Sequence, residues 1–389
     1  MCMISYSFYE NDTRIQQYVK ALTDRGDEVD IISLRRPGFP EEQQFDRVTI
    51  HRIQERKVQE RGKFSYAWRL GMFFWRTLMQ VARLHHRKKF DVVHVHSVPD
   101  FLIFSAAIPK WAGAALILDI HDILPEFYAS KFSVTHDSLP FSLMLLAERA
   151  SVAFANRTIV ANEIWNARIE ERCGANGKCI TIRNYPDERI FQPRAKSSSD
   201  GFAILYPGTL NHHQGLDLAV KAFSQVVEKM PNAVFDIYGE GPAKPSLQDL
   251  IVKFGLEQRV RLHDFLPVDQ IATVMAAADL AVVPKRASDQ FGTEAASTKI
   301  LEFMSVGVPV IVSRTKIDTS YFDDSLVMFF DSDDAEQLAA AMLKVYSDPV
   351  LRNRLRANGL EYARQNCWTT RRRDYLDLVD SLIRAKRTA

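Results

Sequence analysis

Short apolar runs alternate along the chain with longer amphipathic segments of helical period. In the first half, the runs expected to form strands are residues 3–7, 29–33, 49–53, 92–96, 115–119 and 158–161. In the second half they are residues 202–206, 234–238, 260–263, 280–284 and 309–313. Amphipathic stretches such as 14–24 and 64–84 separate several of these runs. Strands that are apolar on both faces, with helices between them, predict parallel sheets covered on both sides.

The chain has 389 residues, which is too long for one ordinary hydrophobic core. A polar, serine-rich stretch at 193–201 has no periodicity and is typical of a linker. We therefore expect two doubly wound, Rossmann-like α/β domains, in residues 1–195 and 196–368, facing an interdomain cleft. Ligands of such sheets bind beyond the carboxyl ends of the strands, so the chemistry is expected in that cleft.

The composition is that of a soluble globular protein, with 47% hydrophobic and 25% charged residues and a net charge of +2. No window approaches 18 uninterrupted apolar residues, so no transmembrane helix is predicted. The first residues, MCMISYSFYEND, lack the features of an export signal, and the four cysteines have no disulfide or zinc spacing. We expect a cytoplasmic protein with reduced thiols.

Two glutamates and a lysine precede an apolar run near residue 310. A helix is expected to begin near Ser297 or Thr298 and to end at Gly307, which places Lys299 and Glu302 on its first turns. Glu294 lies ahead of this helix in the expected loop FGTE. Eight helical residues span about 12 Å, so the two carboxylates suit the two ends of a nucleotide-sugar, with its phosphates over Lys299 and the helix end. The alternative is a pair of solvated surface glutamates.

Glycines follow two of the expected strands in the second half. Gly239 and Gly241 come after the run 234–238, but Lys244 replaces the third glycine of a dinucleotide fingerprint, which disfavours a nicotinamide site. The segment LYPGTLNHHQG at 205–215 places backbone amides at a helix N-terminus, where they suit a phosphate. The alternatives are a plain turn and an ordinary strand–helix loop.

The E-x7-E pattern followed by EFMSVGVPVI resembles glycosyltransferase family 4, which contains retaining enzymes of the GT-B fold. The segments 91–101, 116–128, 181–191, 207–223, 238–242 and 260–284 follow the order and spacing of that family's motifs. The chain is most similar to the branch that builds bacterial exopolysaccharide and O-antigen chains.

The resemblance implies roles for individual residues. Glu302 matches the glutamate that holds the ribose hydroxyls, which suits a carboxylate accepting two O–H donors. Glu294 matches the glutamate that reaches the donor sugar, beside the backbone amides of Phe291, Gly292 and Thr293. His121 matches the histidine at the reacting centre; the alternative is a histidine in an ordinary strand-end turn. His121 and Glu294 are therefore the expected catalytic residues.

The chain departs from the family pattern where the donor diphosphate is bound. Thr209 and Gln214 stand where the family carries an arginine and a lysine. The cations expected to replace them are Lys285, Arg286 and Lys299, and further donor contacts are expected from Gly208, Thr209, Gly239, Gly241 and Thr298. The family's first-loop glycines are also absent. Acceptor binding is expected at Asn11, Arg14, His96, Asp122 and Glu126.

The resemblance implies a retaining, metal-independent transfer without a cofactor. The donor would be a UDP- or GDP-sugar and the acceptor a lipid-linked or other saccharide, and Asp331–Asp333 would be a loop rather than a metal-binding D-x-D. The alternatives are an epimerase or phosphorylase on the same fold and a non-catalytic partner subunit. Residues 369–389, in a helix beginning near Trp368, would return to the first domain.

Residues 56–89 contain ten lysines and arginines but only one glutamate. Two apolar stripes are expected on the helix there, one of Ala67, Leu70, Phe74, Leu78 and Val81 and one of Trp68, Met72, Trp75 and Met79. Such a helix suits an anionic membrane surface, which would place the enzyme at the inner face of the cytoplasmic membrane. Alternatively, both stripes pack inside the domain. No recognition fold for nucleic acid accompanies the charge.

Overall fold

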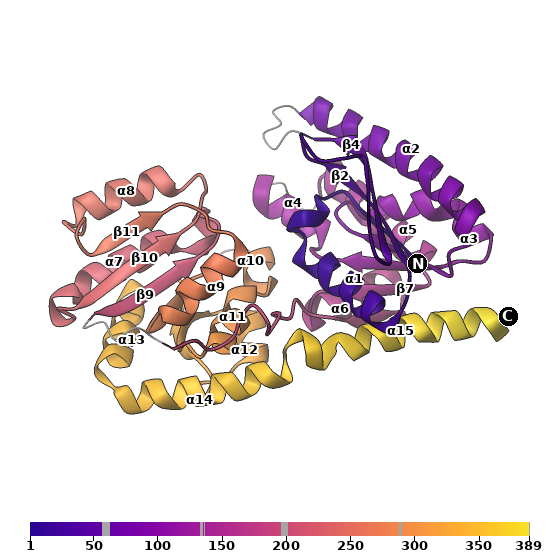
Figure 1. The fold of residues 1–389 in the computed structure, drawn as a ribbon. Helices are drawn as coiled ribbons and strands as arrows, with labels where there is room; N and C mark the ends of the chain where they lie inside the picture. The colour runs from indigo at the N-terminus through magenta and orange to yellow at the C-terminus, as the bar shows by residue number, and fades with distance from the viewer. Residues whose placement is uncertain (57–62, 133–134, 136, 196–200, 288–289, 389) are drawn as a thin grey trace. The chain divides into compact units, whose positions relative to one another are not determined.

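The computed structural model describes all residues except 57–62, 133–134, 136, 196–200, 288–289 and 389. The chain divides into two compact units (Figure 1). The N-terminal unit comprises Met1–Asn184 and Arg372–Ala389, and the C-terminal unit comprises Tyr185–Arg371. Residues 185–195, expected in the first domain, thus group with the C-terminal unit. The centre of the expected linker, and part of the basic segment 56–89, lie outside the described residues.

An eight-stranded sheet forms the centre of the N-terminal unit, in the order β3-β4-β2-β1-β5-β6-β7-β8 over the described residues. Its strands are β1 (Cys2–Ser5), β2 (Val29–Arg35), β3 (Glu42–Phe45), β4 (Val48–Glu55), β5 (Val92–His96), β6 (Ala115–Ile120), β7 (Arg157–Val160) and β8 (Cys179–Thr181). Its helices are η1 (Tyr9–Asn11), α1 (Thr13–Arg25), α2 (Lys63–Lys88), η2 (Asp100–Ala106), α3 (Ala107–Trp111), α4 (Leu124–Phe132), α5 (Leu139–Phe154) and α6 (Glu163–Cys173). The neighbouring strands are parallel, apart from β3, which runs antiparallel to β4.

A six-stranded parallel sheet forms the centre of the C-terminal unit, in the order β11-β10-β9-β12-β13-β14 over the described residues. Its strands are β9 (Phe202–Pro207), β10 (Ala233–Tyr238), β11 (Val260–His263), β12 (Leu280–Val283), β13 (Val310–Arg314) and β14 (Met328–Asp331). Its helices are η3 (His212–Gln214), α7 (Leu216–Val226), η4 (Val227–Lys229), α8 (Lys244–Lys253), α9 (Val268–Ala277), α10 (Gln290–Glu294), α11 (Thr298–Val306), α12 (Lys316–Tyr321), α13 (Ala335–Ser347) and α14 (Pro349–Gln365). The final helix, α15 (Trp368–Thr388), begins in this unit and continues into the N-terminal unit.

Both faces of the second sheet are buried, as the continuous apolar runs predict. Ile204 and Tyr206 of β9 enter a core that includes residues of α7, α8 and α13, whereas Leu205 enters a core that includes residues of α9 and α11. Successive side chains of a strand point to opposite faces, so a strand covered on both sides must be apolar throughout. The prediction of two parallel-sheet α/β units is confirmed.

Three strands were not predicted. β3 reads EQQF and is largely exposed at the sheet edge, so no apolar run marks it. β8 has only three residues and lies at the other edge of the first sheet. β14 has four residues and lies at an edge of the second sheet. The expectation that FGTE is a loop is wrong, because these residues belong to the short helix α10. The predicted helix after it is observed as α11, ending at Gly307 with a left-handed φ of 76°.

The helix α2 buries a different ridge from the one expected. Phe73 and Thr77, which belong to neither expected stripe, are fully buried together with Val81 of the first stripe. The other members of that stripe are half-buried (Leu70, Phe74 and Leu78) or exposed (Ala67). In the second stripe, Trp68, Trp75 and Met79 are 72%, 60% and 63% exposed. The alternative in which both stripes pack inside the domain is therefore wrong for the second stripe.

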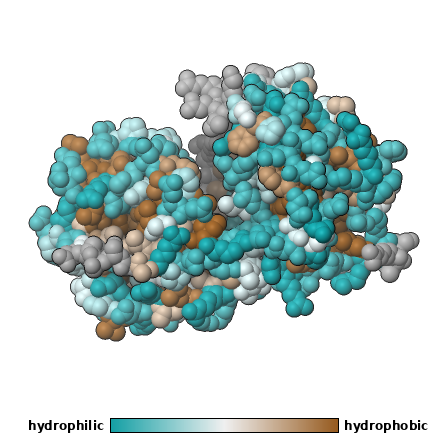
Figure 2. Space-filling view, viewed as in Figure 1, coloured by the Kyte–Doolittle hydropathy of each residue, from teal (hydrophilic) through white to brown (hydrophobic). Residues whose placement is uncertain are grey.

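The end of the chain packs on the N-terminal unit beside α1 (Figure 1). Arg25 of α1 pairs with Asp380 of α15 at 2.6 Å, and the Tyr375 hydroxyl lies 3.0 Å from Nδ1 of His94. The visible face of each unit is mainly hydrophilic, with apolar residues in small groups (Figure 2). Among the described helices, none has both the length and the apolar character needed to span a membrane.

Candidate active site

In the C-terminal unit, the topology places one set of predicted residues at a switch point. β9 lies between β10 and β12, so the chain leaves β9 toward one side of the sheet and later returns to its other side. The loops after these three strands carry Gly208, Gly239 and Lys285 respectively. Crevices at such points are the usual ligand sites of open parallel sheets.

The glycines allow these loops to pack backbone against backbone. The amide of Gly208 donates to the carbonyl of Tyr238, 2.8 Å away. A Cβ at Gly239, whose φ is 150°, would lie only 1.8 Å from the carbonyl oxygen of Gly208. A Cβ at Gly241 would lie 2.4 Å from the carbonyl oxygen of Leu210. Side chains at these two positions would therefore push the loops apart.

Lys299 crosses the same loop from the first turn of α11. A Cβ at Gly208 would lie 2.4 Å from Cε of Lys299, so the glycine makes room for the lysine. The ammonium of Lys299 is 5.4 Å from the centre of the Tyr206 ring. The Tyr206 hydroxyl in turn shares its one proton between the Thr209 carbonyl at 3.1 Å and Gln214 Oε1 at 3.0 Å. The two residues that depart from the family pattern thus hold Tyr206 beneath Lys299.

Burial dominates the ionisation of Lys299 and Glu302. It lowers the pKa of Lys299, against the opposing charge of Glu302. It raises the pKa of Glu302, against the charge of Lys299 and a hydrogen bond with Thr298. Both residues are half-buried at the switch point, where an added anion would interact more strongly with the lysine than in open solvent.

The two other predicted diphosphate cations are already paired. Lys285 is 5% exposed, donates to the Ala295 carbonyl at 2.6 Å and pairs with Asp318 at 3.2 Å. Arg286 pairs with Asp217 at 2.6 Å and also with Asp333. Lys299 has no ion-pair partner within 4 Å among the described residues. Lys285 instead fixes the chain beside Glu294.

A cation that was not predicted contacts Glu294. Lys316, the first residue of α12, donates to the Glu294 carboxylate at 3.0 Å, and its backbone amide donates to Thr293 at 3.2 Å. Glu294 is only 2% exposed, whereas the Lys316 side chain is 60% exposed. The two residues are 22 positions apart in different elements, so no local spacing indicated this contact. Phe291 and Gly292 lie on α10 ahead of Glu294.

In the N-terminal unit, a second set of predicted residues surrounds Asp119 near the end of β6. Arg14 donates to both carboxylate oxygens of Asp119 at 2.9 Å. His96 Nδ1 and His121 Nε2 each lie 3.3 Å from Asp119 Oδ2, and the same two nitrogens are 3.3 Å apart. His94 Nε2 is 3.7 Å from that oxygen. The structure therefore brings Arg14, His96 and His121 together around a carboxylate that the prediction omitted.

The electrostatics of this cluster follow from burial and from Arg14. Burial acts to raise the pKa of Asp119, but Arg14 and His121 hold that pKa well below its ordinary value. Burial lowers the pKa of His94, and it lowers the pKa of His96 to about 3. Both histidines are therefore neutral at pH 7. Burial also raises the pKa of Asp122, the residue after His121, against the opposing effect of His121.

Burial separates the predicted acceptor residues into two groups. Arg14 and His96 are 7% and 0% exposed, so they contact Asp119 and orient His121 from the buried side of the cluster. Glu126 is 5% exposed and is paired with Arg172 of α6. Asn11, in η1, is exposed, and Asp122 is half-buried. A direct contact with an acceptor stays a prediction for these last two residues.

His94, His96 and Asp119 also offer three ligand atoms within 4.8 Å of one another. Both carboxylate oxygens of Asp119 already accept hydrogen bonds from Arg14, however. The guanidinium supplies the positive charge that a metal ion would otherwise bring, and it would repel such an ion. The donor atoms are thus present, but their charge does not favour a metal.

The two sheets, each with its polar cluster at the carboxyl ends, define a two-domain enzyme of the GT-B type. Residues 12–184 match the family described as "Glycosyl transferase 4-like domain", and residues 187–362 match "Glycosyl transferases group 1". The two matches together span most of the chain. The chain belongs to these glycosyltransferases, and the resemblance to family 4 is confirmed.

Individual relatives agree with this assignment. D-inositol 3-phosphate glycosyltransferase of Thermomonospora curvata is 25% identical over 382 residues, covering 91% of this chain and 86% of the relative. O-antigen biosynthesis glycosyltransferase WclY of Escherichia coli is 26% identical over 259 residues, covering 63% of this chain and 67% of the relative.

Solved structures show the same fold. Sucrose-phosphate synthase from Thermosynechococcus elongatus has a TM-score of 0.79 at 18% identity, covering 99% of both chains. Anabaena HepE in complex with UDP-glucose has a TM-score of 0.70 at 16% identity, covering 98% of this chain and 99% of that one.

Proposed function

We propose that this glycosyltransferase moves a sugar, with retention at the anomeric carbon, from a nucleotide-diphospho-sugar to an acceptor hydroxyl. The observation that carries the proposal is the convergence of Gly208, Lys299 and Glu302 at the switch point of the C-terminal unit. A UDP- or GDP-sugar fits this chemistry, and HepE, which shares the fold, binds UDP-glucose.

Each end of the donor has a suitable partner. The Glu302 carboxylate would accept hydrogen bonds from the two ribose hydroxyls, and Lys299 would face the diphosphate. Glu294, fixed by Lys316, would reach the donor sugar with the backbone of Phe291, Gly292 and Thr293 beside it. Thr298 and Thr209, with the glycine loops, complete the donor set.

The protein's main contribution to the reaction is positioning and electrostatic stabilisation. In front-face retention, a phosphate oxygen of the donor takes the proton of the acceptor hydroxyl, so no strong protein base is required. Lys299 would stabilise the negative charge that develops on the departing diphosphate. His121, held by Asp119, would contribute at the reacting centre. No cofactor or metal ion takes part in this scheme.

The proposed acceptor is a lipid-linked saccharide in bacterial surface polysaccharide assembly. The sequence branch and the relative WclY support this choice, as does the exposed aromatic and cationic face of α2. Trp68, Trp75 and Met79 would enter the interfacial region of an anionic membrane, placing the enzyme at the inner face of the cytoplasmic membrane.

Ligand-dependent melting provides the first test. UDP, GDP, ADP, CMP and NAD are added singly to the purified protein, since a ligand that binds only the native state raises the melting temperature. We expect stabilisation by UDP or GDP and none by NAD. Stabilisation by no nucleotide would overturn the donor site. With a donor identified, NMR of the product's anomeric proton tests retention, and activity in excess chelator tests metal independence.

A further inference from the structure

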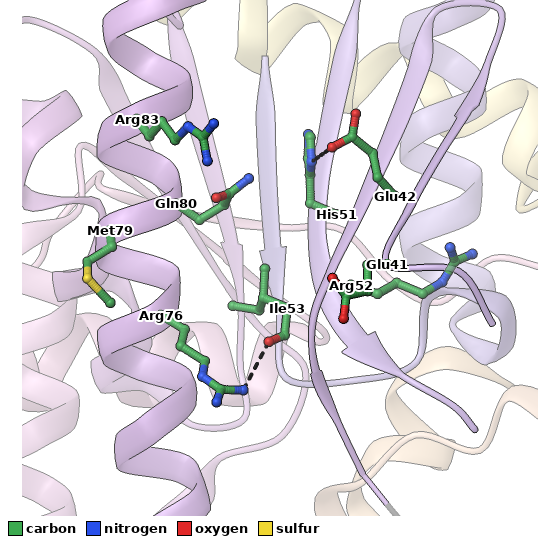
Figure 3. A pocket seen from close by; sticks show the side chains of 9 residues that line it. All are labelled: Glu41, Glu42, His51, Arg52, Ile53, Arg76, Met79, Gln80 and Arg83. Carbon is green, nitrogen blue, oxygen red and sulfur yellow. Dashed lines mark hydrogen bonds and ion pairs between the residues drawn. The ribbon is translucent and has the colours of Figure 1, made fainter. Parts of the chain in front are cut away.

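The N-terminal unit contains a pocket that includes no residue of the candidate active site. It lies between α2 and the hairpin of β3 and β4, and its volume is about 470 Å³ (Figure 3). Arg76, Gln80 and Arg83 line it from α2. His51 and Ile53 of β4 and Glu42 of β3 lie opposite.

The three α2 residues form one row of hydrogen-bond donors. They are spaced i, i+4 and i+7, so they occupy the same face of the helix over two turns, or roughly 10 Å. Figure 3 shows the side chains of Gln80 and Arg83 directed across the pocket toward β4. Arg76 donates to the Ile53 carbonyl at 3.2 Å, which fixes its guanidinium at the lower edge.

The donor row of α2 carries a net positive charge, because two of its three residues are arginines. The other charged side chains of the lining have partners: Arg52 pairs with Glu10 and Glu41 pairs with Arg35, while Glu42 lies 3.4 Å from His51 across the β3–β4 side of the pocket. Arg76 is held by a neutral carbonyl, and Arg83 has no ion-pair partner within 4 Å among the described residues. Two arginines are thus available for an anion. A guanidinium binds phosphate oxygens through paired N–H donors, which makes phosphate the favoured anion.

Apolar side chains lie directly beside the donor row. Met79 and Trp75 precede Gln80 and Arg76 by one residue each, and they are 63% and 60% exposed. Met79 belongs to the pocket lining, and Figure 3 shows its side chain turned away from the β-strands. A ligand that carries a phosphate next to an acyl chain matches both rows of the helix.

We propose that this pocket binds the phosphate of an anionic lipid headgroup through Arg76, Gln80 and Arg83. Trp75 and Met79 contact the acyl region of the same lipid. The inference rests on the membrane contact of the proposed function and gives it a defined site. α2 then recognises one headgroup chemistry instead of responding only to the overall surface charge.

The test compares two kinds of vesicle with the same surface charge. Phosphatidylcholine vesicles contain either phosphatidic acid, which presents a phosphate, or oleic acid, which presents a carboxylate. Partition of the full-length protein is measured by co-sedimentation. We expect the wild type to favour the phosphatidic acid vesicles by about tenfold, the effect of one good charge-assisted hydrogen bond.

Matched variants of α2 separate recognition from general attraction. Arg83→Gln should abolish the preference for phosphatidic acid. Arg87→Gln removes one charge from the same helix outside the pocket, so it should weaken both partitions by about fivefold and keep the preference. Arg83→Lys keeps the charge without the paired donors, and it should reduce the preference while leaving the oleic acid partition unchanged. Melting temperatures confirm that each variant folds.

Four results would overturn the inference. Equal partition of the wild type onto both vesicles, or equal loss of preference in Arg83→Gln and Arg87→Gln, would mean that only surface charge is sensed. Binding of glycerol 3-phosphate in calorimetry as strong as vesicle binding would assign the pocket to a soluble phosphate. Absence of partition onto either vesicle would reject the membrane contact and this site together. The donor site would be unaffected, because UDP stabilisation tests it separately.

Discussion

Arg14 and Asp119 form a buried pair with two N–H···O distances of 2.9 Å, although 105 positions separate them in the sequence. The pair ties the first turn of α1 to the end of β6. Asp119 Oδ2 also lies 3.3 Å from His121 Nε2. The orientation of the proposed catalytic histidine therefore depends on an ion pair with almost no access to solvent.

Asp119→Asn should destabilise the protein by about 3–5 kcal/mol, because it leaves the Arg14 guanidinium buried without its counter-charge. Urea unfolding at pH 7 measures the loss as a lower midpoint. The double variant Arg14→Leu with Asp119→Leu should cost less than the sum of the two single changes, since neither charge is then left alone. A loss below about 1 kcal/mol in Asp119→Asn would contradict the importance of the pair.

His121→Gln should lower the transfer rate by about 10²-fold, the scale of losing one positioned group at the reacting centre. The affinity for the donor nucleotide should stay unchanged, because the proposed nucleotide contacts all belong to the C-terminal unit. Initial rates and calorimetry with UDP measure the two effects. A matched loss in nucleotide affinity would instead assign His121 to donor binding.

Lys299→Met should weaken UDP binding by about tenfold and leave uridine binding unchanged, since the lysine is proposed to face the diphosphate. Calorimetry with both ligands measures the difference. Lys285→Met provides the contrast: it leaves Asp318 buried without its partner, so the melting temperature should fall. If Lys285→Met alone removed the discrimination between UDP and uridine, the assignment of the two lysines would be reversed.

Glu302 predicts a pH dependence of donor binding. Burial raises its pKa, and only the carboxylate accepts hydrogen bonds from both ribose hydroxyls. As the pH falls through the raised pKa, the carboxylate is protonated and the affinity for UDP should decrease. This decrease should begin at a higher pH than it would for a glutamate with an ordinary pKa. Glu302→Gln should bind UDP about 10–100-fold more weakly at pH 7.5. Its affinity should then vary less with pH, as calorimetry between pH 5 and pH 8 would show.

Local patterns sufficed for the sheets and for the helix α11. The apolar runs identify strands buried on both faces, and the spacing of Lys299 and Glu302 before Gly307 places both residues on one short helix. These features depend on neighbours within a few positions along the chain. The polar edge strand β3 gave no such signal, because its side chains pack against little.

Contacts between distant elements were outside the reach of such patterns. Asp119 contacts Arg14 of α1 and His96 of β5 as well as His121, which follows its own strand, and its position in an apolar strand suggested no such role. The pairing of Lys285 with Asp318 likewise depends on tertiary structure, so the sequence alone kept this lysine among the candidate diphosphate cations. The helices and strands that carry the candidate residues were therefore easier to predict than the contacts of those residues.

The raised pKa of Asp100 predicts that this residue contributes less to stability as the pH rises toward neutrality. This carboxyl group is 2% exposed in η2, and burial with the nearby charge of Glu148 raises its pKa from 3.8 to about 7. Below pH 3.8 both the folded and the unfolded group are protonated, so the stabilisation is fully present. Between pH 3.8 and 7 the unfolded chain releases the proton and the folded chain keeps it. The contribution of Asp100 to the free energy of unfolding therefore decreases by about 1.4 kcal/mol for each unit of pH over that range.

Asp100→Asn removes this titration while keeping a neutral polar group of the same shape. The melting temperature of the variant, relative to the wild type, should therefore be higher at pH 8 than at pH 5. Asp249→Asn, on the exposed side of α8, is the matched control, and its difference from the wild type should be similar at the two pH values. An Asp100→Asn difference that does not change with pH would show that Asp100 is ionised in the folded protein throughout this range.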